Sequence, residues 1–186
     1  HLIHIPHKIL LSSFINSPIF GYMNKMRALG LFVSALVLAI TSYMMMHRPL
    51  WGFIPLFNYG SIFAIVLQLS FKAIAKDSMH QRWLKLSLFS GVLLTIGFPP
   101  SPLFVGMIVG FIPLMMVEKE MIGHFKKAKT GLLFKYLFFG FWLWNLLTTF
   151  WVANTAYFAG MVANVANALL MTLPWLVYHR FTHNKS

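Results

Sequence analysis

Six long apolar stretches, separated by short polar or charged segments, divide most of the sequence. A helix that crosses a bilayer needs about 20 mostly apolar residues, and the third and fourth stretches reach that length only with their flanking residues. The pattern predicts an all-α, polytopic transmembrane bundle of about six spans. The predicted spans cover residues 28–46, 51–74, 84–98, 103–117, 132–152 and 156–178.

The segment before the first span, residues 1–27, carries a shorter apolar patch, KILLSSFINSPIFGY. Its length and its two prolines, Pro6 and Pro18, favour a segment at the membrane interface over another span. Met23 or Met26, which lie just before the first long stretch, would make a natural start. We therefore expect either a fragment or a chain whose true start follows this patch.

A proline-rich corner joins the third and fourth apolar stretches, in SGVLLTIGFPPSPLFVGMIVGFIPLMMVEKE. Pro99, Pro100 and Pro102 each fix φ and push the preceding residue out of the α region, so a helix should stop there. A short stiff turn also leaves few backbone groups unpaired at the lipid boundary. We expect the tight external turn of a helical hairpin here, with VEKE marking the return of the chain to the cytoplasm.

Basic residues occur in segments that alternate between rich and poor along the chain. The proline corner and the hairpin WNLLTTFWVANTAYFAG carry no charge, and the turn after the first span carries only Arg48. Six spans produce this alternation under the positive-inside rule, so both termini are expected in the cytoplasm and the proline corner outside. The rich segments hold Lys8, Lys25 and Arg27; Lys72, Lys76, Arg82 and Lys85; Lys119, Lys126, Lys127, Lys129 and Lys135; and Arg180 and Lys185.

The composition excludes a single water-soluble domain. The 186 residues are 59% hydrophobic and 10% charged, against about 25% charged residues in soluble domains. The formal net charge is +12, but the basic residues lie between apolar stretches and not on one face of a domain. That placement argues against nucleic acid as a partner and favours membrane lipids. Because the chain has no cysteine, disulfides, thiolate metal sites and a cysteine nucleophile are excluded within it.

Catalytic signatures are nearly absent from the sequence. Its three acids, Asp77, Glu118 and Glu120, all fall in predicted cytoplasmic loops, so no carboxylate relay for protons lies within a span. His179 and His183 stand four positions apart and could share a helix face as metal ligands, but no third ligand is near in sequence. We interpret them as anchors of a helix end, and expect no catalytic residue, metal or cofactor in this chain.

Amides and aromatic rings gather at the second uncharged hairpin. Tryptophan and tyrosine at headgroup depth form the ordinary aromatic belt of a membrane protein, whereas an amide without a partner costs a few kcal/mol to bury. Asn164 and Asn167, deeper in the last span, are likewise expected to bond another helix or a ligand's polar group. An outward-opening lipid groove would use such residues, and its candidate lining set is Trp144, Asn145, Trp151, Asn154 and Tyr157.

Small residues mark places where helices are expected to approach closely. Gly106 and Gly110 form a GxxxG motif in the fourth span, and Ala156, Gly160 and Ala163 follow one another along the sixth. We expect these positions to pack within the bundle rather than to form a homodimer.

Three pieces of the sequence between residues 84 and 179 resemble one known family. They are LSLFSGVLLTIGFPPSPLFVGMIVGFIPLMMVEKE, FKYLFFGFWLWNLLTTFWVANTAYFAG and ANALLMTLPWLVYHR. The first looks like the opening hairpin of the apolipoprotein N-acyltransferases, particularly the Bacteroidetes-like members. The other two resemble the third and fourth spans of that family. The resemblance covers about half of the chain and includes no catalytic signature.

The resemblance implies a multi-pass enzyme of the bacterial inner membrane. Such enzymes transfer an acyl chain from a phospholipid to the N-terminal diacylglyceryl-cysteine of a lipoprotein, through a thioester on an enzyme cysteine. A Glu-Lys-Cys triad in an external nitrilase-like domain performs the transfer: the thiolate attacks the lipid ester, the carboxylate shuttles the proton and the lysine steadies the oxyanion. The phospholipid acyl donor and the lipoprotein substrate are therefore the expected partners, beside the membrane lipids.

The chain departs from the family pattern in two ways. It stops after the equivalent of the fourth family span, without the nitrilase-like domain and its cysteine, and residues 28–75 supply two extra spans. The leading hypothesis is the membrane part of such an enzyme, which anchors it and forms a wall of its lipid opening without being catalytic alone. The alternative is a complete small multi-span protein, either a transporter subunit or a scaffold that binds lipid or partner helices. A pseudogene or gene-calling artefact is a third.

Overall fold

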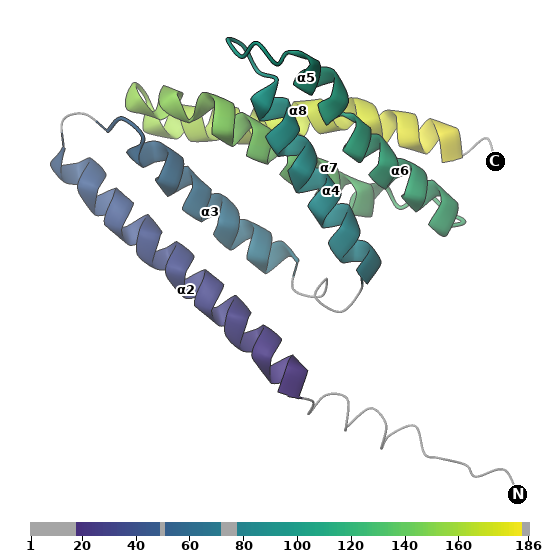
Figure 1. Cartoon of the computed structure of the whole chain (residues 1–186), viewed down its shortest axis with the longest axis horizontal. Coiled ribbons are helices and arrows are strands. Elements are labelled where there is room, and N and C mark those ends of the chain that lie inside the picture. Colours follow the sequence, from purple (N-terminus) through teal and green to yellow (C-terminus); the bar gives the residue numbers. More distant parts are fainter. Residues whose placement is uncertain (1–17, 49–50, 72–77, 184–186) are drawn as a thin grey trace, which may run out of the picture.

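The computed structural model describes residues 18–48, 51–71 and 78–183. Every regular element in these ranges is a helix, which confirms the predicted all-α fold. Residues 1–17 of the predicted interfacial segment lie outside the described residues, as do Lys72, Lys76, Asp77 and Lys185. In chain order the elements are α2 (Pro18–His47), α3 (Ile54–Ser70), α4 (Ser78–Ile96), α5 (Val105–Gly110), α6 (Ile112–His124), α7 (Thr130–Thr149), the 3₁₀ helix η2 (Phe150–Asn154) and α8 (Tyr157–His183) (Figure 1).

Three stretches of these helices are long and apolar enough to cross a bilayer. They are Lys25–His47, Thr130–Asn154 and Tyr157–Thr182, and they correspond to the first, fifth and sixth predicted spans. Large apolar side chains stay exposed along the first and third, such as Phe32 at 65% and Phe158 at 78%. A water-soluble monomer rarely leaves so much contiguous apolar surface uncovered. The fold is therefore that of a membrane protein.

The residues of the fourth predicted span, 103–117, do not form one continuous helix, and the crossing itself stays a prediction. α5 ends at Gly110, α6 begins at Ile112, and Pro113 occupies one of the first two positions of α6. Pro113 has no N–H to donate to the carbonyl of Val109, and its ring crowds that carbonyl, so a straight helix does not run through it. The proline corner behaves as predicted, because α4 ends at Ile96 and α5 begins only at Val105.

Charged residues expected in the cytoplasmic loops lie on helices instead. α6 continues to His124 and carries Glu118 and Glu120, and α4 starts at Ser78, ahead of Arg82. Glutamate, lysine and methionine favour helix, and the acids of α6 are held by partners on other helices. The loop assignment of these residues was therefore wrong, although their position near the charge-rich end of the helices is retained.

α7 is the central helix of the bundle. α4 and α8 both pack along α7, α2 packs on α3, and α3 reaches α7 and η2, while α5 and α6 fold back over α4 (Figure 1). α2 and α3 contain the residues of the two predicted extra spans. They pack on the rest of the bundle through α3. The largest fully buried side chains of the core are Trp83, Leu94, Leu114, Met121, Leu133, Tyr136, Leu137 and Phe141.

Glycines allow α4 to pack closely on its neighbours. A Cβ added at Gly140 of α7 would lie 2.7 Å from the carbonyl oxygen of Ser87, a separation at which a neighbour must shift. In the GxxxG motif, a Cβ at Gly106 would lie 3.1 Å from Cα of Gly97, and one at Gly110 would lie 2.8 Å from the Leu94 side chain. Both glycines of the motif therefore pack inside the bundle, as predicted.

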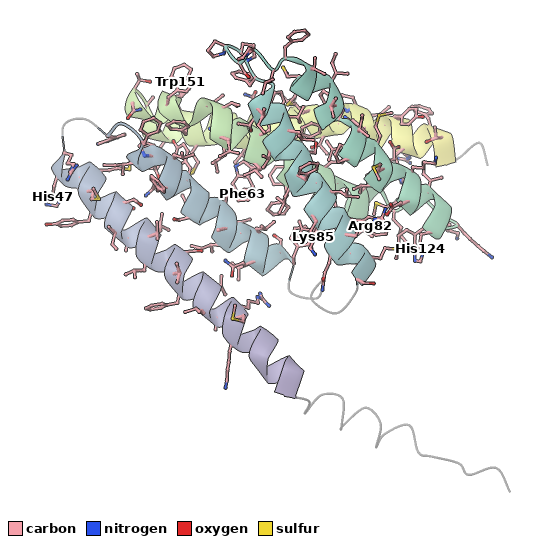
Figure 2. All side chains as sticks on the ribbon, in the orientation of Figure 1. His47, Phe63, Arg82, Lys85, His124 and Trp151 are labelled. Carbon is pink, nitrogen blue, oxygen red and sulfur yellow. The ribbon has the colours of Figure 1, made fainter. Side chains whose placement is uncertain are left out.

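The charge-rich ends of the helices gather at one end of the bundle. Nη2 of Arg27 in α2 donates to the carbonyl oxygen of Gln68 in α3 at 2.9 Å, and Lys135 of α7 donates to the carbonyl of Ser70. Arg82 and His124 lie toward this end, whereas Trp151 lies toward the opposite one (Figure 2). The alternation of charge along the sequence therefore becomes a separation of charge in space.

Candidate functional site

The five predicted lining residues do not line one groove. Trp144 and Asn145 are buried on α7, Trp151 and Asn154 are exposed on η2, and Tyr157 begins α8 with its side chain half-buried. Their role in contacting lipid stays a prediction. The structure separates the set into residues that pack between helices and residues that cap the uncharged end of the bundle.

Asn145 is satisfied inside the protein. Its Nδ2 donates to the carbonyl oxygen of Phe141 at 2.9 Å and lies 3.8 Å from the sulfur of Met171 on α8. We expected this amide to bond either another helix or a ligand. In the structure it bonds its own helix and contacts α8. Asn145 therefore contributes to the α7–α8 contact.

Trp144 differs from Asn145 because its polar atom has no partner in the described part of the chain. Nε1 of Trp144 is buried and finds no hydrogen-bond acceptor among the described residues. The ring stands edge-on to Phe98, directly before the proline corner, with 6.2 Å between the ring centroids. A buried indole N–H normally has an acceptor. Nε1 of Trp144 is therefore an unsatisfied donor inside the bundle, close to the proline corner.

The residues of η2 tie the uncharged ends of the helices together. Nδ2 of Asn154 donates to the carbonyl oxygen of Gly52 at 3.2 Å, in the turn between α2 and α3. Nε1 of Trp151 donates to the carbonyl of Thr148 at 3.1 Å, and its ring remains exposed (Figure 2). An exposed ring at this end is the arrangement expected of an aromatic belt.

A polar junction centred on Asn58 joins α2, α3 and α8. Nδ2 of Asn58 donates to Oγ1 of Thr41 and to Oγ of Ser42, each at 3.0 Å, and its Oδ1 accepts the Tyr157 hydroxyl at 2.6 Å. The Tyr59 hydroxyl donates to the backbone carbonyl of Tyr157. Asn58 is 1% exposed, so its amide is buried with both its donors and its acceptor engaged. We call this group the Asn58 junction.

A narrow crevice lies between α3, α7 and α8, close to this junction. Asn164 forms its polar side: its Nδ2 donates to the carbonyl of Gly160 at 2.9 Å, and its Oδ1 accepts the Thr149 hydroxyl at 3.2 Å. Asn167, the second amide of the last span, is exposed. The remaining walls are apolar or aromatic, and the lining residues are Tyr59, Ile62, Trp142, Leu146, Met161 and Asn164.

At the charge-rich end, both acids of α6 are paired across helices. Oε1 of Glu118 lies 3.5 Å from Nδ1 of His179 on α8, and both side chains are buried. Glu120 accepts from Arg82 at 2.8 Å and from the indole N–H of Trp83 at 2.9 Å, both on α4. The two acids lie two positions apart, so they face different sides of α6, one toward α8 and the other toward α4.

The metal hypothesis finds no support from these contacts. The residues that the structure describes hold no group of three or more His, Asp or Glu side chains that could bind a metal ion. His179, near the C-terminus of α8, faces Glu118. The side chain of His183 lies outside the described residues. Two candidate ligands are fewer than a structural or catalytic zinc site uses.

Sequence reasoning missed two of these arrangements for different reasons. Asn58 carries a signal, because it is an amide within the second apolar stretch, and the rule applied to Asn145 also predicts a partner for it. The pairing of Glu118 with His179 carries none, since 61 positions separate them and only the packing of α6 on the bundle brings them together.

Comparison with known proteins identifies no relative. No family model, no curated protein and no solved structure matches the chain.

Proposed function

We propose that the chain is the membrane-embedded N-terminal part of an apolipoprotein N-acyltransferase, where it anchors the enzyme and forms part of the wall of its lipid opening. The support for the family is the sequence resemblance between residues 84 and 179. The support for a lipid role is the unsatisfied indole N–H of Trp144, whose ring lies against Phe98 at the proline corner. The chain is not catalytic alone in this proposal, because the thioester requires a cysteine that it lacks.

The proposal includes six crossings of a bacterial inner membrane with both termini in the cytoplasm. The gathering of Arg27, Arg82 and Lys135 near one end of the bundle supports it, because basic residues stay preferentially on the cytoplasmic side. α5 and α6 together would provide the fourth crossing despite the break between them. An interrupted helix is tolerated at membrane depth where the interruption is buried against neighbouring helices.

The observation that carries the lipid role is the buried indole N–H of Trp144, which has no acceptor among the described residues. Phospholipids bring ester carbonyl and phosphate oxygens to the headgroup boundary, and the uncharged end of the bundle lies at that depth in the proposed topology. Because this N–H is buried, such an oxygen would have to enter beside the Trp144 ring to accept from it, and the hydrogen bond would then contribute about 0.5–1.5 kcal/mol. The exposed Phe104, just past the corner, would border the same opening.

Photo-crosslinking tests the lipid role directly. The chain in nanodiscs is titrated with a phospholipid that carries a diazirine in one acyl chain, and labelling is measured for wild type, Trp144→Phe and Trp51→Phe. We expect Trp144→Phe to raise the lipid concentration for half-maximal labelling by about two- to tenfold, the loss of one hydrogen bond. Trp51→Phe is the matched control, because the N–H of Trp51 already donates to the backbone carbonyl of Met45 and Trp51 is not one of the candidate lining residues. Equal behaviour of the two variants contradicts the lipid role of Trp144.

The enzyme claim has its own test, in the gene. We expect the coding sequence beyond Ser186 to continue into a nitrilase-like domain that carries the glutamate, lysine and cysteine of the family. Membranes that contain the whole product should then transfer a labelled acyl chain from phospholipid to a diacylglyceryl-cysteine peptide. A stop codon close to Ser186, or a following domain without the three residues, removes the acyltransferase proposal.

A complete multi-span scaffold is the second candidate, and the Asn58 junction favours it. The helices formed by residues from 28–75, which the resemblance leaves out, are bonded to α8 through buried polar groups and are not a loosely attached extension. A stable bundle of all the described helices, purified without any further domain, is the result that this candidate requires.

A further inference from the structure

One face of α4 combines basic side chains with an apolar continuation. Six residues line an open recess of about 600 Å³, and they recur at the spacing of a single helix face. The recess lies at the charge-rich end of the bundle, where Arg82 and Lys85 lie close together on α4 (Figure 2). Its lining residues are Ser78, Gln81, Arg82, Lys85, Leu86 and Phe89.

The rest of α4 fixes this face on the outside of the bundle. Trp83, Ser87 and Leu94 point into the core and are fully buried, which leaves the opposite side of the helix uncovered. Lys85 is exposed and Phe89 is 55% exposed. Because the core contacts hold α4 in this rotation, the recess is a stable feature of the surface.

The polarity of the face changes along the helix axis. The cationic groups of Arg82 and Lys85 occupy the first turns, and exposed apolar side chains, Val92 and Ile96, continue the face past Phe89 toward the proline corner. A long lysine side chain beside apolar surface can extend its ammonium group toward the polar boundary. The face therefore presents positive charge at the boundary and apolar surface below it.

Among the described acids, Glu120 pairs with Arg82 of this face, and none pairs with Lys85. Glu118 is buried against His179, and Glu120 engages Arg82 through one nitrogen, Nη2, while 60% of the Arg82 side chain stays exposed. A guanidinium has five N–H donors, so donors remain for a second anionic group. Among the described residues, Arg82 forms no second ion pair and Lys85 forms none.

We propose that this face of α4 binds one anionic phospholipid, with the phosphate between Arg82 and Lys85 and an acyl chain along Leu86 and Phe89. Anionic lipid complements both properties of the face, since basic residues at the cytoplasmic boundary attract such lipids. The inference rests on the proposed membrane topology and does not require the acyltransferase function. It assigns this site to a resident lipid on the charge-rich side, distinct from any lipid near Trp144.

The test compares lipid headgroups and matched variants. The full 186-residue chain in mixed micelles is titrated with phosphatidylglycerol or with phosphatidylcholine of the same acyl chains, and bound lipid is counted by native mass spectrometry. We expect wild type to prefer phosphatidylglycerol, and Lys85→Gln to lower its affinity about fivefold, the effect of one basic residue at an anionic surface. Lys85→Arg should restore the affinity, and binding of phosphatidylcholine should not change.

Lys127→Gln is the control, because Lys127 is an exposed lysine at the same end of the bundle outside the α4 face. An unchanged affinity in this variant supports a defined site. Equal binding of the two lipids by wild type, or equal losses in Lys85→Gln and Lys127→Gln, overturns the proposal. The first result excludes a charge-selective site, and the second shows a diffuse effect of net charge. Neither result bears on the resemblance or on Trp144.

Discussion

The carboxylate of Glu118 on α6 lies 3.5 Å from the imidazole Nδ1 of His179 on α8, and both side chains are buried. The described chain contains only two acids, and this one is placed where α6 meets the last helix. A buried pair of this kind costs desolvation to form, but leaves an uncompensated polar group when one partner is removed. The pair therefore adds little net stability to the fold, and its main effect is to fix how α6 packs against α8.

Removal of the Glu118 carboxylate should destabilise the bundle. We expect Glu118→Ala to lower the free energy of unfolding by about 1–3 kcal/mol, and Glu118→Gln, which keeps the size and a hydrogen-bonding group, to lower it less. Unfolding in detergent measures both. Lys119→Ala, on the exposed face of the same helix, should cost little. In the double variant with His179→Ala the two losses should not add, and simple additivity would show that the pair is not coupled.

Loss of the Asn58 junction should loosen α2 and α3 from α8. Hydrogen bonds between helices in membranes contribute about 0.6 kcal/mol each, with a maximum of about 1.7 kcal/mol, and Asn58 makes three. We expect Asn58→Leu to cost about 2 kcal/mol in total and Tyr157→Phe, which removes one bond, to cost roughly a third of that.

Two measurements test the junction. One is the yield of a disulfide engineered between α3 and α8, and the other is the stability to unfolding in detergent. Asn167→Leu is the matched control, because it changes an exposed amide on α8. An Asn167→Leu variant as unstable as Asn58→Leu would show that the effect comes from amide removal in general and not from the junction.

The close contact of α4 with α7 should not accept a side chain at Gly140. A Cβ there would lie 2.7 Å from the backbone oxygen of Ser87, and overpacking of this kind costs about 1–3 kcal/mol. Gly131→Ala in the same helix meets nothing within 4 Å, so it should be neutral or slightly stabilising because alanine favours helix. Thermal unfolding in detergent separates the two variants, and equal stabilities would contradict the packing of α4 on α7.

The proposed sidedness can be tested with one engineered thiol at a time, since the chain contains no cysteine. In intact cells stripped of the outer membrane, a thiol reagent that does not cross membranes should label Ser101→Cys in the proline corner. It should label Lys127→Cys only after the membrane is broken. The reverse pattern would invert the topology and would place the α4 lipid site on the external side.

The helical fold and the end of α4 before the proline corner could be predicted from the sequence. The apolar lengths identify α2, α7 and α8, and the absence of N–H groups at Pro99, Pro100 and Pro102 explains why α4 ends before the corner. The same physics at Pro113 breaks the fourth stretch, but a single proline within an apolar run is often tolerated in membrane helices. For that reason the break was not predicted.

What the sequence determined by itself is the class of the protein and the periodic separation of its charges, because helix length, proline and the cost of moving charge into lipid are properties of local segments. The tertiary structure alone decided that Glu118 meets His179, that Asn58 receives Tyr157 and that the outward face of α4 carries Arg82 and Lys85 above Phe89. These relationships join distant positions through the rotation and crossing of whole helices. Packing of large and small side chains sets that rotation, and no local pattern records it.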